Sequence, residues 1–196
     1  MTDSRLTLRQ VRPDDRWTMW EWRNSERIRY VSANDAEIRR EDHAAWFERR
    51  FPQMRDRTVI VQWDAEPVGW FQLEHFDDAT RSGEWGIGLG VVPSTPGLGG
   101  ALVVLALGHA FERVGATEMT GRVLGVNTNV LAVMRRLGFT AEKGDSLVRA
   151  DGSTTDVSVY HVSRDQWPAI RDRGLALLPS ALRAEVAAAL TADLGE

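Results

Sequence analysis

The sequence contains no cysteine, and of its 24 basic residues only Lys143 is a lysine. Without cysteine the chain cannot form a disulfide, use a thiol nucleophile or bind zinc through thiolates. A phosphate-binding loop of the GxxxxGK[ST] type is also excluded, because that loop needs a lysine inside it and Lys143 does not follow such a pattern. These absences leave backbone amides and arginines as the phosphate ligands to expect.

Long apolar runs are also missing: none approaches the roughly 20 residues that a transmembrane helix needs. The opening MTDSRLTLRQ lacks the basic-then-apolar order of a signal peptide, so we expect a cytoplasmic protein without a membrane partner. A net charge of -4 argues against nucleic-acid binding and favours small molecules as partners. The spacing of His43, His109 and His161 is not that of metal ligands, and no metal site is predicted.

What the 196 residues do contain is one domain's worth of regular elements. Periodicity, caps and turns predict strands over 5–11, 58–63, 68–76, 84–92 and 117–124 and a hairpin over 142–162, with helices over 15–24, 40–51, 101–111, 127–137, 164–173 and 180–194. Residues 174–179 set off a C-terminal helical extension (174–196) from the main domain (1–173). That extension either mediates a homodimer or covers the domain's own core.

The strand over 84–92 is unusual because Gly86, Gly88 and Gly90 share one face and leave it nearly bare. Glycines in a strand mark a bulge, a close crossing or the approach of a ligand. A glycine-rich turn then leads into an uncharged helix, whose first N–H groups suit a phosphate or pyrophosphate. No segment here completes the GxGxxG pattern of dinucleotide folds, so hydride transfer is disfavoured.

Together these residues resemble the GCN5-related N-acetyltransferases (GNAT) over about residues 5 to 162. Three segments carry the resemblance: Val91-Val92-Pro93 at the end of the glycine strand, the turn Gly97-Leu98-Gly99-Gly100-Ala101-Leu102, and Asn127 followed by Leu137-Gly138-Phe139. The resemblance implies an α/β (α+β) fold in which helices flank a mixed, mostly antiparallel sheet. It also implies an enzyme that transfers the acetyl group of acetyl-CoA to an amine by direct attack on the thioester.

The same resemblance implies the residues that bind the co-substrate. Backbone amides of Gly97, Leu98, Gly99, Gly100 and Ala101 would hold the CoA pyrophosphate. The Val91 or Val92 amide would polarise the thioester carbonyl, which makes Val92 a catalytic candidate. Asn127 would hydrogen-bond the co-substrate, and Arg135 or Arg136 would meet its ribose phosphate.

Two positions depart from the family pattern. Ser94 stands where most members have Gln or Arg, and Met134 stands where many have the Tyr that protonates the leaving thiolate. A thioether cannot donate a proton. Either the thiolate is protonated through water, or the chain is a non-catalytic CoA-binding sensor or interaction module; both alternatives stay open at the level of sequence.

The N-terminal third has a narrower resemblance, to acetyltransferases of pseudaminic acid biosynthesis that modify the amino group of a nucleotide-linked sugar. The residues that carry it, and that it implies as acceptor ligands, are Trp22, Arg23, Asn24, Arg29, His43 and Trp46. Trp17, Trp20 and Trp70 would join Trp22 and Trp46 in walling the acceptor side. Core packing explains the tryptophans equally well, and LTLR with VSVYHVSRDQW also resembles ribosomal-protein N-terminal acetyltransferases.

An amine that attacks a thioester must first lose a proton to a general base. Glu84 at the start of the glycine strand, and Glu74 or His75 on the preceding strand, are the candidates. For His75 a place at a sheet edge near a loop is a slightly better explanation than catalysis.

Overall fold

The computed structural model describes residues 4–92 and 95–195 and contains a seven-stranded sheet. Its strands lie in the order β1-β2-β3-β4-β5-β9-β6, and every neighbouring pair is antiparallel except β4 and β5. The strands are β1 (Leu6–Gln10), β2 (Thr58–Trp63), β3 (Glu66–Asp77), β4 (Ser82–Leu89), β5 (Glu118–Leu124), β6 (Glu142–Lys143) and β9 (Val157–Ser163). The predicted mixed, mostly antiparallel sheet is confirmed.

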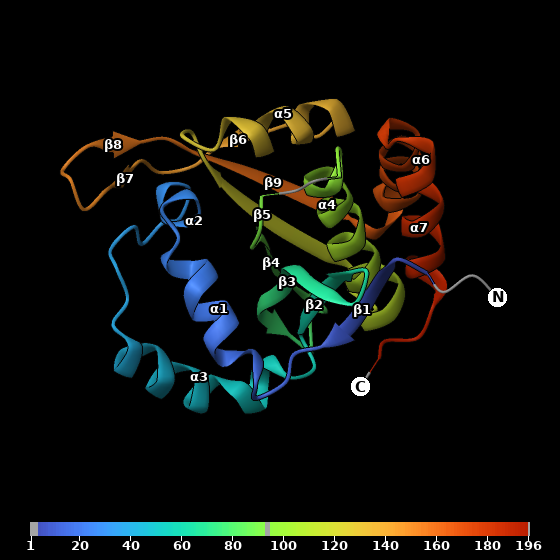
Figure 1. The fold of residues 1–196 in the computed structure, drawn as a ribbon. Coiled ribbons are helices and arrows are strands. Elements are labelled where there is room, and N and C mark those ends of the chain that lie inside the picture. The colour runs from blue at the N-terminus through green and yellow to red at the C-terminus, as the bar shows by residue number, and fades with distance from the viewer. Residues whose placement is uncertain (1–3, 93–94, 196) are drawn as a thin grey trace.

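Helices cover both faces of this sheet (Figure 1). They are α1 (Asp15–Asn24), α2 (Glu26–Tyr30), α3 (Arg40–Met54), α4 (Leu98–Gly108) with the π-helical turn η1 (His109–Val114), α5 (Thr128–Leu137), the 3-10 turn η2 (Arg164–Gln166), α6 (Trp167–Leu177) and α7 (Ser180–Thr191). The first three helices lie on one side of the sheet, and α4, α6 and α7 lie on the other.

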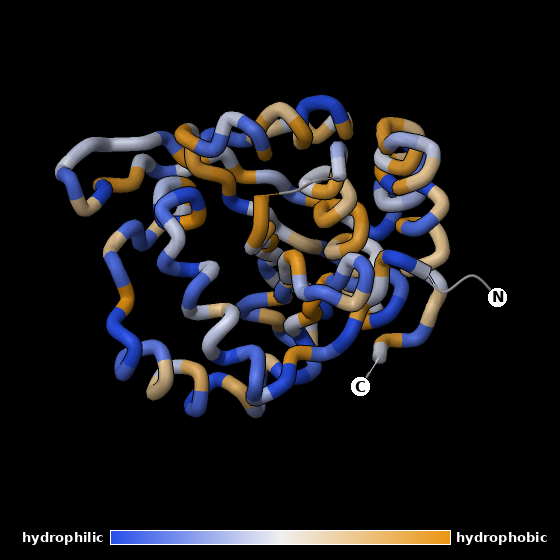
Figure 2. Tube along the Cα trace, viewed as in Figure 1, coloured by the Kyte–Doolittle hydropathy of each residue, from blue (hydrophilic) through white to orange (hydrophobic). Residues whose placement is uncertain are grey.

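The main core is built around α4, which is buried nearly all the way round, as its uncharged sequence predicts. Figure 2 shows its apolar trace in the middle of the molecule. The C-terminal helices cover it closely: Gly174 of α6 packs on Val104, and Leu190 of α7 packs on Gly108. The predicted boundary between residues 173 and 174 falls inside α6, and the C-terminal helices pack against the core of the domain.

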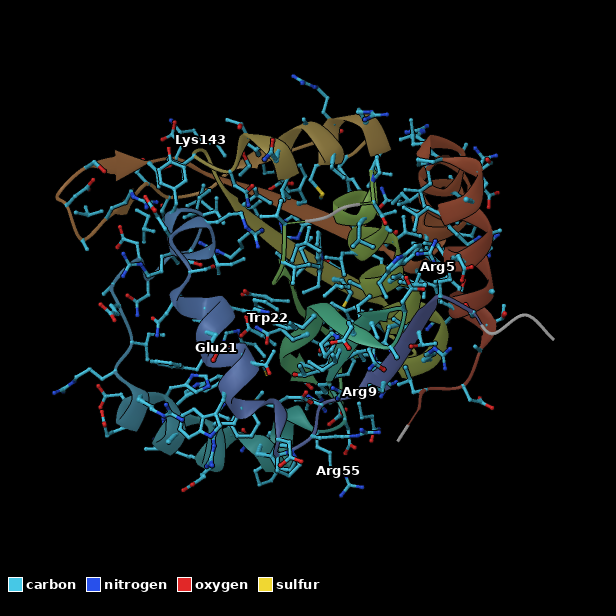
Figure 3. The ribbon with its side chains drawn as sticks, viewed as in Figure 1. Arg5, Arg9, Glu21, Trp22, Arg55 and Lys143 are labelled. Atoms are coloured by element: carbon cyan, nitrogen blue, oxygen red, sulfur yellow. The ribbon has the colours of Figure 1, made fainter. Side chains whose placement is uncertain are left out.

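A second, smaller core lies between the opposite face of the sheet and α1–α3. At its centre the ring of Trp22 on α1, which Figure 3 labels, stacks on the ring of Trp70 on β3, with 5.5 Å between centroids and 9° between planes. Ile60 on β2 and Phe47 on α3 complete the contact. Burial of such large rings is the main reason that α1 and α3 hold to the sheet.

The prediction of a bare glycine face on β4 is wrong. A Cβ atom at Gly88 would collide with the ring of Trp70, and one at Gly90 would collide with the ring of Trp22. The glycines therefore make room for two indoles. The strand also ends at Leu89 instead of residue 92, because the N–H groups of Gly90 and Val91 both turn to the Val68 carbonyl, at 2.8 and 3.3 Å.

Two further elements differ from the prediction. The short helix α2 was not expected; the side chain of Ser25 caps it by accepting from the Ile28 N–H. The hairpin over 142–162 is divided, because only β6 pairs with β9, while β7 (Leu147–Val148) and β8 (Thr154–Thr155) form a sheet of their own.

A buried ion pair explains where the β7–β8 hairpin lies. A guanidinium nitrogen of Arg149 is 3.2 Å from a carboxylate oxygen of Asp35, in the loop after α2, and both side chains are largely buried. Asp35 also accepts from the Ala150 N–H at 3.0 Å. The hairpin is thus attached to the loop that joins α2 to α3.

No helix within the described ranges has the length and apolar character needed to cross a bilayer. Over the same ranges, no three His, Asp or Glu side chains come together as they would around a metal ion.

Candidate active site

The parallel strands β4 and β5 separate halfway along their length. They pair from Ser82 and Glu118 to Trp85 and Gly121, where the Trp85 ring lies over Gly121, and no pairing follows. A cavity of 260 Å³ lies beside this split. It is lined by Arg23, Ile28, Val31, Ser32, Trp70, Gln72, Trp85, Gly86, Ile87, Arg122, Val123, Leu124, Asn127 and Val130. We call it the split-strand cavity.

The glycine turn at the start of α4 has the geometry of an anion site. Gly97 adopts φ +90°, which residues with a side chain rarely adopt, and no acidic residue follows in the first turn. A Cβ built at Gly99 would meet none of the described residues within 4 Å, so this side of the turn is open as far as the structure describes it. The first N–H groups of a helix carry partial positive charge, which an anion would stabilise.

The arginines of α5 differ in how they lie relative to this turn. Both are exposed, but Arg136 shares a cavity of 80 Å³ with Gly97 and Gly100, whereas Arg135 lines neither this cavity nor the split-strand cavity. Asn127 lines the split-strand cavity and caps α5, its Oδ1 accepting from the Val130 N–H at 3.3 Å. Its Nδ2 group remains as a donor.

The two predicted carbonyl-polarising amides are also unequal. The Val91 N–H is engaged by the Val68 carbonyl, whereas the Val92 N–H has no hydrogen-bond partner among the described residues, and Val92 is 82% exposed. Ser94 lies outside the described residues. Met134 is fully buried in the main core, so neither its chemistry nor its position offers a proton to a leaving group.

A second pocket, of 530 Å³, lies between α1, α3 and β3, and we call it the α1–α3 pocket. It is lined by Met19, Arg23, Asn34, Glu37, Ile38, Asp42, His43, Trp46, Trp70, Gln72 and Glu74. Arg23, Trp70 and Gln72 line the split-strand cavity as well. The two spaces therefore adjoin at these three side chains.

Arg23 is the charged group at this junction. Its Nη2 donates to the Asn34 carbonyl, while its Nη1 is buried with no hydrogen-bond partner among the described residues. Burial, and then the nearby charge of Arg29, lower the pKa of Arg23. An arginine stays protonated nonetheless, so a cation with one buried nitrogen unpaired among the described residues lies where the two cavities adjoin.

Of three other predicted acceptor residues, two line the α1–α3 pocket and the third holds the loop beside it. Trp46 is partly exposed and lines the α1–α3 pocket. His43 also lines it, but its Nε2 donates to the Arg16 carbonyl at 2.8 Å and burial lowers its pKa, so it is neutral at pH 7. Asn24 lines neither space; its amide makes two hydrogen bonds to the Ile38 backbone, at 2.9 and 2.8 Å.

Neither pocket is lined by Arg29 or by three of the predicted indoles, which are Trp17, Trp20 and Trp22. Trp22 is buried against Trp70, which is the core packing that the sequence left as an alternative. Trp20 donates to the Ile38 carbonyl at 2.8 Å, and Trp17 lies under the Arg40 guanidinium at 4.1 Å. Of the five tryptophans expected on the acceptor side, Trp46 and Trp70 line the pocket.

Among the three candidate bases, Glu74 alone lines the α1–α3 pocket. Its Oε1 accepts from Gln72 Nε2 at 2.8 Å. Glu84 lies opposite Glu74 in the β3–β4 pairing but lines neither space. His75 has φ +50° where the pairing shifts register, its side chain is 74% exposed, and its Nδ1 is 3.9 Å from Glu84 Oε1.

The sequence analysis missed the loop between α2 and α3, which supplies Asn34, Glu37 and Ile38 to the pocket. No periodicity or motif marks this loop, because its placement depends on long-range contacts of Asn24 and Arg149. It also missed Arg27 on α2, whose Nη2 donates to the Leu89 carbonyl at 2.6 Å and fixes the end of β4.

Two comparisons with known proteins agree with this geometry. Residues 5–140 match the model of a family described as an acetyltransferase (GNAT) domain. The fold resembles a spermidine N-acetyltransferase from Vibrio cholerae, solved in complex with CoA and spermine, with a TM-score of 0.71 and 19% identity over 85% of this chain and 99% of that one.

It also resembles yncA from Salmonella typhimurium, solved with its cofactor acetyl-CoA, with a TM-score of 0.64 and 19% identity over 83% of this chain and 95% of that one. At these identities the structural likeness establishes the fold alone. No curated protein is detectably similar in sequence.

Proposed function

The chain belongs to the GNAT family of acetyl-CoA-dependent N-acetyltransferases, and we propose that it acetylates the amino group of a nucleotide-linked amino sugar. One observation carries the proposal: the split-strand cavity and the α1–α3 pocket adjoin at Arg23, Trp70 and Gln72. A thioester in the first would lie beside an amine in the second. Direct attack needs no covalent enzyme intermediate, and there is no cysteine to form an acyl-cysteine.

For acetyl-CoA we assign the pyrophosphate to the backbone amides of residues 97–101. The positive φ of Gly97, the open side of Gly99 and the absence of acidic residues in the first turn support this assignment. Arg136 shares a cavity with Gly97 and Leu178, on the side of the turn away from Gly99, so we assign Arg136 to the ribose phosphate and not to the pyrophosphate. The pantetheine would follow the unpaired edge of β4 beyond Trp85, within reach of the Asn127 amide.

For the chemical step we assign the general base to Glu74. It takes the proton from the acceptor ammonium, and the freed nitrogen lone pair attacks the thioester carbonyl carbon. Collapse of the tetrahedral intermediate breaks the C–S bond, and the nitrogen gives up its second proton to water. Water passes a proton on to the CoA thiolate, since Met134 offers none. The Val92 N–H would stabilise the oxyanion, a contribution of about 3 kcal/mol for one well-placed donor.

For the acceptor, a nucleotide-linked sugar is supported by three features of the α1–α3 pocket. Its volume of 530 Å³ accommodates part of such a ligand. The partly exposed indole of Trp46 offers a face on which a base or sugar can stack. The free Nη1 of Arg23 would donate to a phosphate oxygen.

The test is thiol release from acetyl-CoA in the presence of UDP-linked amino sugars. Because the chain has no cysteine, a thiol reagent reports free CoA with no background from the protein. We expect turnover with a UDP-linked 4-amino sugar and a raised melting temperature with that sugar alone. Absence of both effects, while acetyl-CoA still binds, would exclude this acceptor class.

One observation favours a second acceptor class, a small cationic amine. Three carboxylates, Glu37, Asp42 and Glu74, line the α1–α3 pocket with Arg23 as the one arginine of its lining. Such an excess of negative charge attracts a cation and keeps its amine close to a base. Spermine bound to the structurally similar Vibrio cholerae enzyme is a ligand of this kind.

The two classes differ in how they respond to variants at this pocket. A cationic acceptor should bind more weakly after Glu37→Gln and improve or stay unchanged after Arg23→Met. A nucleotide-linked sugar should bind more weakly after Arg23→Met, and its binding should improve or stay unchanged after Glu37→Gln. Competition between spermine and a UDP-sugar in the thiol-release assay, repeated at low and high salt, compares the two directly.

A further inference from the structure

The turn that joins α6 to α7 lies against the glycine turn at the start of α4. A Cβ built at Gly97 would lie 3.1 Å from Cδ of Pro179 and 3.5 Å from Cδ2 of Leu178. Leu178 Cδ2 also lies 3.9 Å from the corresponding position at Gly100. Leu178 is only 6% exposed, so the contact is part of the main core.

This packing is confined to one side of the glycine turn. Gly97 and Gly100 face the α6–α7 turn, whereas no atom of residues 4–92 or 95–195 outside the turn itself lies within 4 Å of a Cβ built at Gly99. The turn therefore has a packed side, supported by residues about 80 positions further along the chain, and an open side. The open side is the one that we have assigned to the pyrophosphate.

A turn of this composition needs such support. Glycine has access to more backbone conformations than any other residue, and Gly97 sits in one of them, at φ +90°. No side chain caps the N-terminus of α4 in the described structure. A turn that is not held in place would have to be ordered when an anion binds, and that ordering weakens binding.

We propose that Leu178 and Pro179 are positioning residues for the acetyl-CoA site, which hold the Gly97 turn with its N–H groups aligned for the pyrophosphate. The C-terminal helices thereby contribute to co-substrate affinity as well as to the core. The proposal rests on the assignment of residues 97–101 to the pyrophosphate. It concerns binding only, and predicts no change in the chemical step.

The experiment compares Leu178→Ala with Leu190→Ala. Both variants shorten a leucine that packs on a glycine of α4, but Leu190 packs on Gly108 at the opposite end of the helix. We expect Leu178→Ala to raise the Kd of acetyl-CoA in isothermal titration about tenfold, because the turn loses its support. Leu190→Ala should lower the melting temperature and leave that Kd unchanged. Leu178→Met, which refills the space, should restore binding.

The outcomes separate the possible failures. If wild-type protein does not bind acetyl-CoA, the assignment of the site itself is wrong. If wild-type protein binds and both alanine variants bind equally well, the α6–α7 turn has no positioning role. Once an acceptor is identified, Leu178→Ala should raise the KM for acetyl-CoA with little effect on kcat, a split that general destabilisation would not produce.

Discussion

At the scale of single residues, Arg23 is only partly satisfied by the protein around it. One of its terminal nitrogens binds a backbone carbonyl, and the other is buried without a partner among the described residues. Leaving a charged donor unpaired in a buried place is unfavourable unless a ligand completes it. The position of Arg23 between two cavities identifies where that ligand would lie.

We therefore expect Arg23→Met to weaken binding of a phosphate-bearing acceptor by roughly 10- to 100-fold, the loss of one charge-assisted hydrogen bond. The Kd of acetyl-CoA should stay within about twofold. Isothermal titration of each ligand measures both. Arg55→Met is the matched control, because Arg55 lies just past the end of α3 and is exposed (Figure 3). An equal loss in both variants would contradict the assignment.

Glu74 and Glu84 provide a second comparison, since they lie opposite each other on β3 and β4 and differ in access to the α1–α3 pocket. Glu74→Gln keeps the shape and removes the proton acceptor. We expect kcat to fall about 10²- to 10⁴-fold, the usual size of a general-base contribution, with acetyl-CoA binding unchanged. Steady-state thiol release at pH 7 measures this. If kcat fell by a comparable factor in Glu84→Gln and not in Glu74→Gln, the general base would be Glu84 on β4.

At the scale of elements, the start of α4 allows a test in which folding and binding respond differently. A Cβ at Gly99 meets no neighbour in the part of the chain that the structure describes, and alanine favours helix over glycine by about 1 kcal/mol. Gly99→Ala should thus leave the melting temperature unchanged or raise it. It should nevertheless weaken acetyl-CoA binding, because the new methyl group would lie where the pyrophosphate approaches the backbone.

Gly97→Ala is the contrasting variant, since at φ +90° it strains the backbone itself. We expect it to lower both the melting temperature and acetyl-CoA affinity. Differential scanning fluorimetry and titration on the same samples separate the two effects. Unchanged acetyl-CoA binding in Gly99→Ala would place the pyrophosphate elsewhere.

Elements set by local sequence were predictable, and those set by distant contacts were not. The helix over 15–24 and the strand over 58–63 were predicted from the turn at Pro13-Asp14 and from β-branched residues, and both have the predicted bounds, although no side chain caps the helix. In contrast, the glycines of β4 gave no sign that indoles from α1 and β3 would cover them. The same applies to β7 and β8, which the ion pair of Asp35 and Arg149 draws away from the main sheet.

The candidate site was predictable in a similar way. The glycine turn and Asn127 belong to local patterns that resemble the GNAT family. The residues proposed to bind the pyrophosphate and the pantetheine of CoA could therefore be named from sequence. The acceptor side depends on which face of α1 meets the sheet. Trp22 and Arg23 are adjacent in sequence, yet one enters the core and the other lines the pocket. Mixed aromatic spacing in α1 could not decide between those faces.

At the scale of the whole molecule, buried histidine links stability to pH. His109 is 4% exposed, neither ring nitrogen has a hydrogen-bond partner among the described residues, and burial is the main cause that lowers its pKa to about 4. Between pH 6.5 and about 4, His109 is protonated in the unfolded chain and neutral in the folded chain. The free energy of unfolding must then fall as the pH drops from 6.5 to about 4.

This single group accounts for a loss of roughly 3 kcal/mol at pH 4 and below. The lowered pKa of His43 acts in the same direction. We expect His109→Leu to reduce the difference in unfolding free energy between pH 7 and pH 4.5 by about 2 kcal/mol. Urea denaturation at the two pH values measures it. A pH dependence equal to that of the wild type would show that the native state accommodates the charged ring.

The hydrogen bond between Asp35 and the Ala150 N–H joins residues that lie 115 positions apart in the chain. A ribosome that has made the first helices has therefore not yet made the hairpin that fixes the loop beside them. The α1–α3 pocket must be completed late in synthesis, once residue 150 has been made. The Gly97 turn waits longer still for Leu178 and Pro179, so on our proposals a nascent chain gains a place for the acceptor before its CoA turn is held.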